Sequence, residues 1–210
     1  MNLFSIEGVE ATGKSSVLLE TIELLSKNKV LCAPKTEFPT DPELINPIMS
    51  AIEKSIFISE SFSSGPASAF FFMLAADCAP LPVDLDKDTV VISERGIDSV
   101  AIYQKFFLPH ARNEETLPFL HELENIYRMI GQTIPQTTFI LQASQETIFK
   151  RFCEREGREL SQHEKKIIIG FIKEYKRLAE FGGRYVAIDA EKSITEIAHV
   201  ISQHILKEMI

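Results

Sequence analysis

The sequence has little cysteine, more acidic than basic side chains, and no long apolar run. Its three cysteines, Cys32, Cys78 and Cys153, are odd in number and show no CxxC spacing, which argues against a disulfide framework and favours a reducing compartment. Lysine and arginine number 22 against 30 acidic residues, so a basic face for nucleic acid is not expected. Because no run of about 18 apolar residues and no signal-peptide pattern is present, we expect a cytoplasmic protein without a membrane partner.

The hydrophobic pattern alternates between short runs rich in β-branched residues and longer segments with helical spacing. Five runs are predicted to be buried strands: residues 3–6, 29–32, 89–92, 138–141 and 185–188. Helical spacing is found at Leu18, Ile22 and Leu25, and again at Ile167, Phe171, Tyr175 and Leu178. The alternation predicts an α/β fold, a five-stranded parallel sheet flanked by helices on both faces, with ligands at the carboxyl ends of the strands. No repeat or linker divides residues 1–210, so we expect a single domain.

The segment from Gly8 to Ser15 matches the pattern G-x-x-x-x-G-K-[ST], directly after the first predicted strand and before the first predicted helix. Gly8 and Gly13 let the backbone turn so that its amides point at phosphate oxygens. Lys14 is expected to reach the β- and γ-phosphates and Ser15 to bind Mg²⁺, with Ser16 beside them at the helix start. The pattern therefore predicts a protein that binds ATP and Mg²⁺.

A loop of this kind leaves the reaction open, because several classes of enzyme use it. Arg151 and Arg155 stand one helical turn apart, and Arg158 follows Gly157. They are typical of a lid, about residues 151–161, that closes over ATP and neutralises charge on the phosphoryl group being moved. We assign Arg155 a catalytic role and the other two arginines a role in ATP binding. The alternative is a solvated basic helix face paired with nearby glutamates.

In ordered motifs along nearly its whole length, the sequence resembles the thymidylate kinase family and, more distantly, the deoxynucleoside kinases. The opening residues 5–15, including the acidic Glu10 in the phosphate loop, are similar to the opening of thymidylate kinases. The further similar segments are Phe38-Pro39, Glu94-Arg95, Ser99, Tyr103-Gln104, the three lid arginines, and residues 175–179 and 188–190. The resemblance implies a phosphate-loop kinase fold, transfer of the γ-phosphate of Mg-ATP to dTMP, and a homodimer. It also makes Glu10 a cofactor-binding residue and Phe38, Arg95, Ser99, Tyr103 and Gln104 substrate-binding residues.

The pair Glu94-Arg95 follows the third predicted strand, where the family has Asp-Arg. A carboxylate at this position can hold Mg²⁺ through water, and a guanidinium can grip the phosphoryl group being moved. Both residues are therefore assigned a catalytic role, and Glu94 also a role as metal ligand. The alternative is an ion pair within the loop.

Three positions on the acceptor side depart from the family pattern. Glu37 stands where the family has an arginine that binds the acceptor monophosphate. Asp77 stands where an arginine meets the thymine ring, and Met73 stands where a phenylalanine stacks on the base, with Phe72 next to it. We include Phe72, Met73 and Asp77 among the candidate substrate-binding residues. The other interpretation makes Glu37 a surface carboxylate beside Lys35 and Asp77 an exposed residue at a helix end.

These departures leave two acceptors open. A carboxylate at position 37 would repel a nucleoside monophosphate, which carries a charge of about −1.5 to −2. Glu37 could instead be the base for the 5′-hydroxyl of a deoxynucleoside. Glu10 and Phe38-Pro39 favour the thymidylate kinase type, so we expect transfer from ATP to a (deoxy)nucleoside monophosphate such as dTMP. The alternatives are a deoxynucleoside kinase with Glu37 as base and a nucleotide-binding module without catalytic activity.

Overall fold

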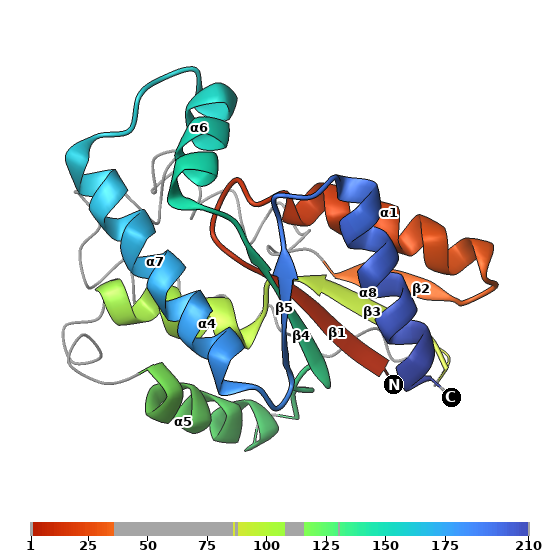
Figure 1. Ribbon diagram of the computed structural model, residues 1–210. Coiled ribbons are helices and arrows are strands. Elements are labelled where there is room, and N and C mark those ends of the chain that lie inside the picture. Colours follow the sequence, from red (N-terminus) through yellow and green to blue (C-terminus); the bar gives the residue numbers. More distant parts are fainter. Residues whose placement is uncertain (1, 36–85, 87, 108–115, 130, 210) are drawn as a thin grey trace, which may run out of the picture.

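The computed structural model describes residues 2–35, 86, 88–107, 116–129 and 131–209, and in these ranges strands alternate with helices (Figure 1). The strands are β1 (Asn2–Glu7), β2 (Cys32–Lys35), β3 (Val90–Glu94), β4 (Thr137–Gln142) and β5 (Tyr185–Asp189). The helices are α1 (Lys14–Lys27), α4 (Ile97–Phe107), α5 (Thr116–Met129), α6 (Gln145–Glu156), α7 (Gln162–Phe181) and α8 (Ile194–Glu208). The predicted α/β class is confirmed.

All five strands run parallel in one sheet, in the order β2-β3-β1-β4-β5. The central strand is β1, in which Ile6 pairs with Glu94 of β3 and Glu7 pairs with Ile140 of β4. Because the carboxyl ends of parallel strands lie at the same edge of a sheet, the segments that follow β1 and β3 are neighbours. The predicted five-stranded parallel sheet is therefore confirmed, and its topology brings the two predicted phosphate-handling segments together.

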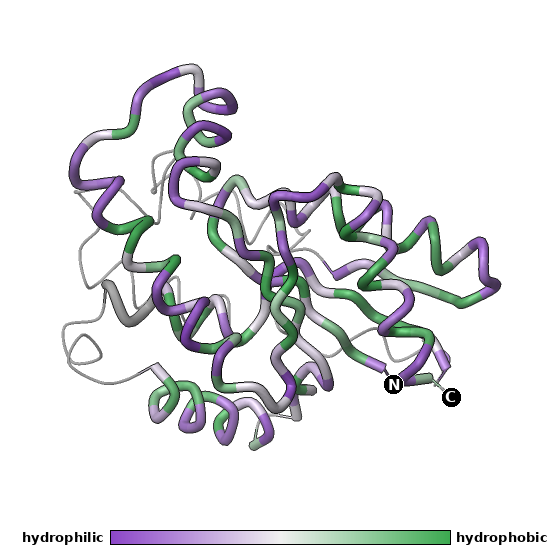
Figure 2. Tube along the Cα trace, viewed as in Figure 1, coloured by the Kyte–Doolittle hydropathy of each residue, from purple (hydrophilic) through white to green (hydrophobic). Residues whose placement is uncertain are grey.

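Helices cover both faces of the sheet (Figure 1). Each face has its own apolar core. On one face α1 and α8 bury residues such as Leu25 and Ile201 against the strands. On the other face α4, α5 and α7 bury Ile102, Leu120 and Phe171. Hydrophobic residues accordingly gather in the sheet and the inner sides of the helices, whereas the turn between α6 and α7 is hydrophilic (Figure 2). Within the described ranges no helix has the length and apolar character that a membrane span requires.

The second strand lies later in the chain than the hydrophobic pattern predicted. It was expected over 29–32 and spans Cys32–Lys35. The reason is the way α1 ends: the backbone N–H of Val30 donates to the carbonyl oxygen of Leu25 at 3.1 Å, and Lys29 has a left-handed φ of 62°. These residues close the helix in a turn, so the chain cannot be extended there even though its side chains suit a strand.

Candidate active site

The segment between β1 and α1 folds into a tight loop whose backbone requires glycine. Gly8 has a φ of 143°, and a Cβ at this position would lie 2.8 Å from the carbonyl oxygen of Leu141, so a larger residue does not fit. Gly13, with a φ of 91°, is the residue before α1, and Ala11 between them has a φ of 62°. The loop predicted from the sequence therefore lies at the carboxyl end of the central strand.

Lys14 folds back over this loop. Its Nζ donates hydrogen bonds to the carbonyl oxygens of Gly8 at 3.1 Å and Val9 at 3.0 Å. Helix α1 begins at Lys14 without a side-chain cap, because Gly13 has no side-chain oxygen, whereas serine hydroxyls cap α6, α7 and α8. The start of α1 thus combines uncapped amides with an ammonium group, which is the combination that binds phosphate oxygens.

Ser15 and Glu94 come together from separate elements. Ser15 lies in the first turn of α1, Glu94 is the last residue of β3, and the hydroxyl Oγ donates to the carboxylate Oε1 at 2.8 Å. Ser15 is exposed and Glu94 is half-buried, so both can reach a bound ligand. A hydroxyl and a carboxylate oxygen are hard ligands of the kind that Mg²⁺ takes, and the residues present fit that ion. Ser16, the next residue of α1, is also exposed.

Arg95 is buried at the centre of the site, with an exposed fraction of 6%. It follows β3 directly and has a left-handed φ of 63°, a conformation uncommon in residues with a side chain. Its Nη1 donates to the hydroxyl of Tyr103 at 2.8 Å, Oγ of Ser99 at 3.2 Å, the carbonyl oxygen of Gly8 at 3.4 Å and the hydroxyl of Tyr175 at 3.4 Å. The guanidinium therefore lies directly beside the first residue of the phosphate loop.

Glu10 contacts the other terminal nitrogen of this guanidinium, Nη2. Its Oε1 accepts from Nη2 of Arg95 at 3.3 Å and from the hydroxyl of Tyr103 at 2.7 Å. Burial raises the pKa of Tyr103 well above its ordinary value, so this hydroxyl keeps its proton and donates. The second oxygen of Glu10, Oε2, is buried and has no hydrogen-bond partner in the described structure. A buried carboxylate oxygen without a donor suits a ligand that brings a hydroxyl or amide group.

Comparison with known families agrees with this geometry. The family model described as thymidylate kinase matches residues 6–201, which is nearly the whole chain. The chain belongs to the thymidylate kinase family. It is therefore a nucleotide kinase, and the enzyme class predicted from the sequence is confirmed. A search of curated proteins found no match.

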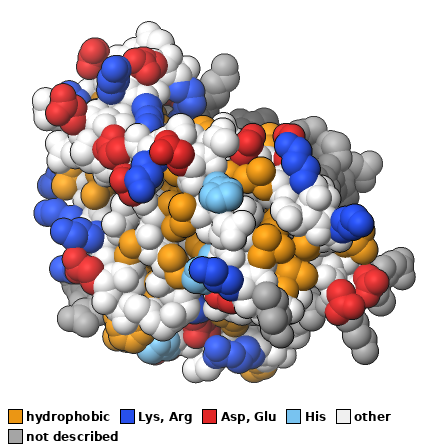
Figure 3. All heavy atoms as spheres, turned by 45° about the vertical axis from the view of Figure 1, so that its right-hand side comes forward, with side chains coloured by type: hydrophobic (Ala, Val, Ile, Leu, Met, Phe, Trp, Pro, Cys, Tyr) orange, Lys and Arg blue, Asp and Glu red, His pale blue; other side chains and the backbone are white. Residues whose placement is uncertain are grey.

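The three arginines predicted to form the lid of this kinase lie in and after α6. Arg151 donates to the carbonyl oxygen of Ala190 at 3.1 Å, and Arg155 forms an ion pair with Glu156 at 2.9 Å. Arg158 binds both carboxylate oxygens of Glu164, at 2.6 and 3.0 Å. Acidic and basic side chains alternate over this end of the molecule, at the upper left of Figure 3. In the described structure the lid arginines thus bind groups of the protein itself, and their role toward ATP stays a prediction.

Several residues predicted for the acceptor side lie outside the described residues: Glu37, Phe38, Phe72, Met73 and Asp77. Gln104 belongs to α4, and its side chain also falls outside the described part. Of the substrate-binding residues predicted for this kinase, the structure thus brings together Arg95, Ser99 and Tyr103 around the loop. The roles of the others stay predictions from the sequence.

Two residues of the site were not assigned to it from the sequence. Glu7, the last residue of β1, is fully buried, and its Oε2 accepts from Oγ of Ser99 at 2.5 Å and from the hydroxyl of Tyr175 at 3.1 Å. Tyr175 comes from α7 and also contacts Arg95. A carboxylate at the end of a largely buried strand was a signal for Glu7. No local pattern distinguishes Tyr175 from an ordinary core residue of an amphipathic helix.

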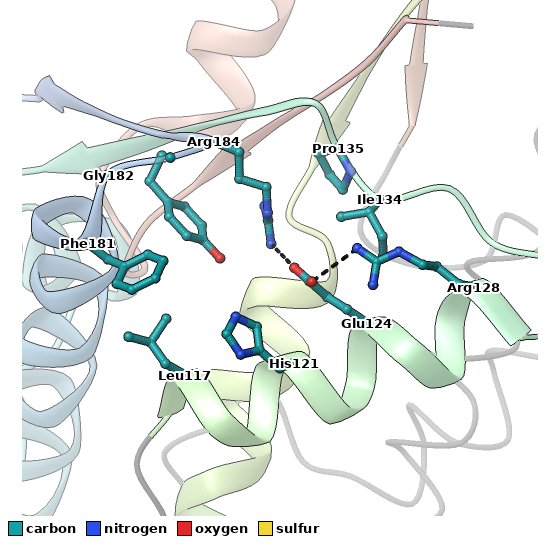
Figure 4. Close-up of a pocket in the computed structure, with 11 residues that line it drawn as sticks. Leu117, His121, Glu124, Arg128, Ile134, Pro135, Phe181, Gly182 and Arg184 are labelled. Atoms are coloured by element: carbon teal, nitrogen blue, oxygen red, sulfur yellow. Dashed lines mark hydrogen bonds and ion pairs between the residues drawn. The ribbon is translucent and has the colours of Figure 1, made fainter.

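The kinase also has a pocket at the opposite edge of the sheet, near the amino ends of β4 and β5 (Figure 4). Its volume is about 410 Å³, and its walls come from α5, the end of α7 and the segments before the two strands. Glu124 lies between Arg184, at 3.1 Å, and Arg128, at 3.3 Å. Arg184 also binds both oxygens of the buried Asp98, at 2.7 and 2.8 Å. These ion pairs balance the charges of the wall, and they join α4 and α5 to the segment before β5.

Proposed function

We propose that this kinase transfers the γ-phosphate of ATP to a (deoxy)nucleoside monophosphate such as dTMP. The observation that carries the proposal is the place of Arg95, whose guanidinium contacts the carbonyl oxygen of Gly8 and the carboxylate of Glu10. A cation beside the first residue of the phosphate loop can hold a second phosphate next to the one bound by the loop. The unpartnered Oε2 of Glu10 supports an acceptor that also carries a hydroxyl group, as a sugar does.

In this proposal each residue acts on a phosphate or holds another residue that does. The loop amides and Lys14 bind the β- and γ-phosphates of ATP, and Arg95 binds the acceptor phosphate. An oxygen of the acceptor phosphate forms a bond to the γ-phosphorus while the bond to the β-phosphate oxygen breaks, and ADP leaves. Ser15 and Glu94 would hold Mg²⁺, which supplies charge neutralisation between the phosphates. No base is required, since the acceptor oxygen is already ionised.

The remaining expectations belong to the same proposal. We propose that residues 1–210 form a single kinase domain, that residues 151–161 act as a lid, and that the enzyme works as a cytoplasmic homodimer. The lid is supported by its arginines and by the left-handed Gly157 that ends α6, with a φ of 66°. Closure would replace the contact between Arg158 and Glu164 by contacts to ATP phosphates.

The test is a panel of nucleosides and nucleoside monophosphates incubated with Mg-ATP, with ADP release followed in a coupled assay. We expect release with a monophosphate, and its loss to background in Lys14→Ala with an unchanged circular dichroism spectrum. The exposed Lys176→Ala on α7 is the matched control and should behave as the wild type. Turnover with nucleosides but not with monophosphates would replace the proposal by the deoxynucleoside kinase with Glu37 as base. No acceptor-dependent ADP at all would refute both.

A further inference from the structure

Glu7 is fully buried, yet its carboxyl group neither belongs to the phosphate loop nor contributes apolar packing to the core. It is the last residue of the buried strand β1, and burial of a carboxylate is costly unless hydrogen bonds compensate for it. Three donors do so: the backbone N–H of Ser99 reaches Oε1 at 3.3 Å, and the hydroxyls of Ser99 and Tyr175 reach Oε2 at 2.5 and 3.1 Å. All three belong to segments that also carry contacts to Arg95.

The directions of these hydrogen bonds are linked to Arg95. Its Nη1 donates to Oγ of Ser99 at 3.2 Å and to the hydroxyl oxygen of Tyr175 at 3.4 Å. Each hydroxyl has one proton, and that proton must point away from the guanidinium for the oxygen to accept from it. Oε2 of Glu7 accepts the proton of Ser99 at 2.5 Å and lies 3.1 Å from the hydroxyl of Tyr175. The two hydroxyls are themselves 2.8 Å apart, so the proton of Tyr175 is shared between Glu7 and Oγ of Ser99. The carboxylate thereby orients two hydroxyl oxygens toward Arg95.

Only an ionised carboxylate satisfies this arrangement completely. A protonated carboxyl group, or the amide of a glutamine, would place a donor against either the N–H of Ser99 or the two hydroxyls. In one of the contacts of residue 7, two donors would then face each other without an acceptor between them. At least one hydroxyl would have to turn its proton, and Nη1 of Arg95 would lose an acceptor.

We infer that Glu7 is a positioning residue for phosphoryl transfer, which holds the Arg95 guanidinium beside the phosphate loop through the hydroxyls of Ser99 and Tyr175. The inference rests on the proposed function, in which Arg95 binds the acceptor phosphate. Glu7 acts through other residues, because Ser99 and Tyr175 lie between its carboxylate and the guanidinium. The device makes the position of Arg95 depend on the protonation of a residue buried beneath the loop.

The charges around Glu7 set the pH at which this device works. Burial, followed by the negative charge of Asp98 on α4, raises the pKa of Glu7 to about 7. The hydrogen bond from Ser99 and the positive charges of Arg95 and of Lys14 on α1 act in the opposite direction. From α7 the neutral hydroxyl of Tyr175 faces Glu7, because burial raises the pKa of that tyrosine well above its ordinary value. Activity should therefore decline as the pH falls below about 7.

The kinetic test compares Glu7→Gln with the wild type in the coupled assay between pH 5.5 and 9. At pH 8 we expect kcat to fall about tenfold, a change of about 1.4 kcal/mol in the barrier, with KM for ATP unchanged. In the pH profile of kcat, the decline below about pH 7, which we call the acidic limb, should be present in the wild type and absent in the variant. Glu180→Gln, an exposed change on α7, is the matched control and should keep both the rate and the limb. A wild-type kcat and an unchanged limb in Glu7→Gln would overturn the inference.

A second variant tests the route through Tyr175. Tyr175→Phe should lower kcat about threefold, and the double variant with Glu7→Gln should be no slower than Glu7→Gln alone, because both changes break the same path. Additive losses of about thirtyfold would overturn the inference. If Glu7→Gln does not fold, Tyr175→Phe is measured alone, with its pH profile of kcat. An unchanged kcat and an unchanged acidic limb in Tyr175→Phe would then overturn the inference.

A measurement without turnover separates this inference from the proposed function. In the ligand-free protein, NMR of ¹⁵N-labelled arginine should show slowly exchanging guanidinium signals for Arg95, assigned by Arg95→Lys. Glu7→Gln should broaden these signals, and Glu180→Gln should leave them unchanged. If the wild type shows no acceptor-dependent ADP but the signals respond to Glu7→Gln, the proposed function fails and the positioning role stands. Equal signals in wild type and Glu7→Gln would overturn the positioning role whatever the acceptor.

Discussion

The stability of Glu7→Gln relative to the wild type should increase as the pH rises. The pKa of Glu7 is raised from 4.5 to about 7 by burial in the first place. A carboxyl group whose pKa is raised on folding favours the folded state below its unfolded pKa, and this contribution is lost as the pH rises through the folded pKa. The wild type therefore loses stability between about pH 4.5 and pH 7, and the neutral glutamine does not.

The magnitude follows from the two pKa values. With 4.5 in the unfolded and about 7 in the folded chain, the free energy of unfolding of the wild type should fall by about 2.5 kcal/mol between pH 5 and pH 8 relative to Glu7→Gln. The donor conflict created by the amide adds a constant offset, because it does not change with pH. The pH dependence of the difference is therefore the informative quantity.

Urea unfolding followed by circular dichroism at pH 5, 6, 7 and 8 measures this difference. At a slope of about 2 kcal/mol per M, the two midpoints should separate by about 1 M more at pH 8 than at pH 5. Glu180→Gln is again the control and should remain parallel to the wild type. Parallel curves for Glu7→Gln and wild type would refute the raised pKa, and with it the expectation that the acidic limb of activity belongs to Glu7.

Three further changes test other parts of the molecule. Glu164→Ala removes the acceptor of Arg158 and half of the capping box with Ser161, and should lower the free energy of unfolding at pH 7 by about 1–2 kcal/mol. The hydrogen bond from Arg158 lowers the pKa of Glu164 to about 2, so this deficit should shrink when urea unfolding is repeated at pH 3. Asp98→Asn breaks the buried pair with Arg184 and should cost about 3–5 kcal/mol in the same assay at pH 7. Glu37→Arg should lower KM for a nucleoside monophosphate about tenfold in steady-state kinetics, if this position faces the acceptor phosphate.

Each of these predictions has an outcome that contradicts it. An equal deficit of Glu164→Ala at pH 3 and pH 7 would mean that its ion pair contributes nothing. A cost below about 1 kcal/mol for Asp98→Asn would mean that Arg184 finds sufficient compensation elsewhere. Unchanged kinetics of Glu37→Arg with both nucleosides and monophosphates would place Glu37 outside the acceptor site.

The sequence by itself determined those features of the fold that depend on residues close together in the chain. The tight loop before α1 was predictable because Gly8 and Gly13 are required by its backbone conformation, and Lys14 completes a motif within a few residues of them. Four of the five strands were located correctly because hydrophobic runs report burial in a parallel sheet, whereas the edge strand β2 is only partly buried. The second strand was misplaced because the turn that closes α1, with its left-handed Lys29, competes with the extended chain in a way that side-chain hydropathy does not reveal.

Only the tertiary structure determined which polar side chains of the site contact one another. Ser15 meets Glu94, and Glu7 meets Ser99 and Tyr175, only because β3 pairs with β1 while α4 and α7 cover the same face. Burial of a carboxylate depends on donors that arrive from distant parts of the chain, and hydropathy along the sequence carries no record of those distances. The sequence thus identified Arg95 as a phosphate-binding candidate, and only the fold determined what holds its guanidinium in place.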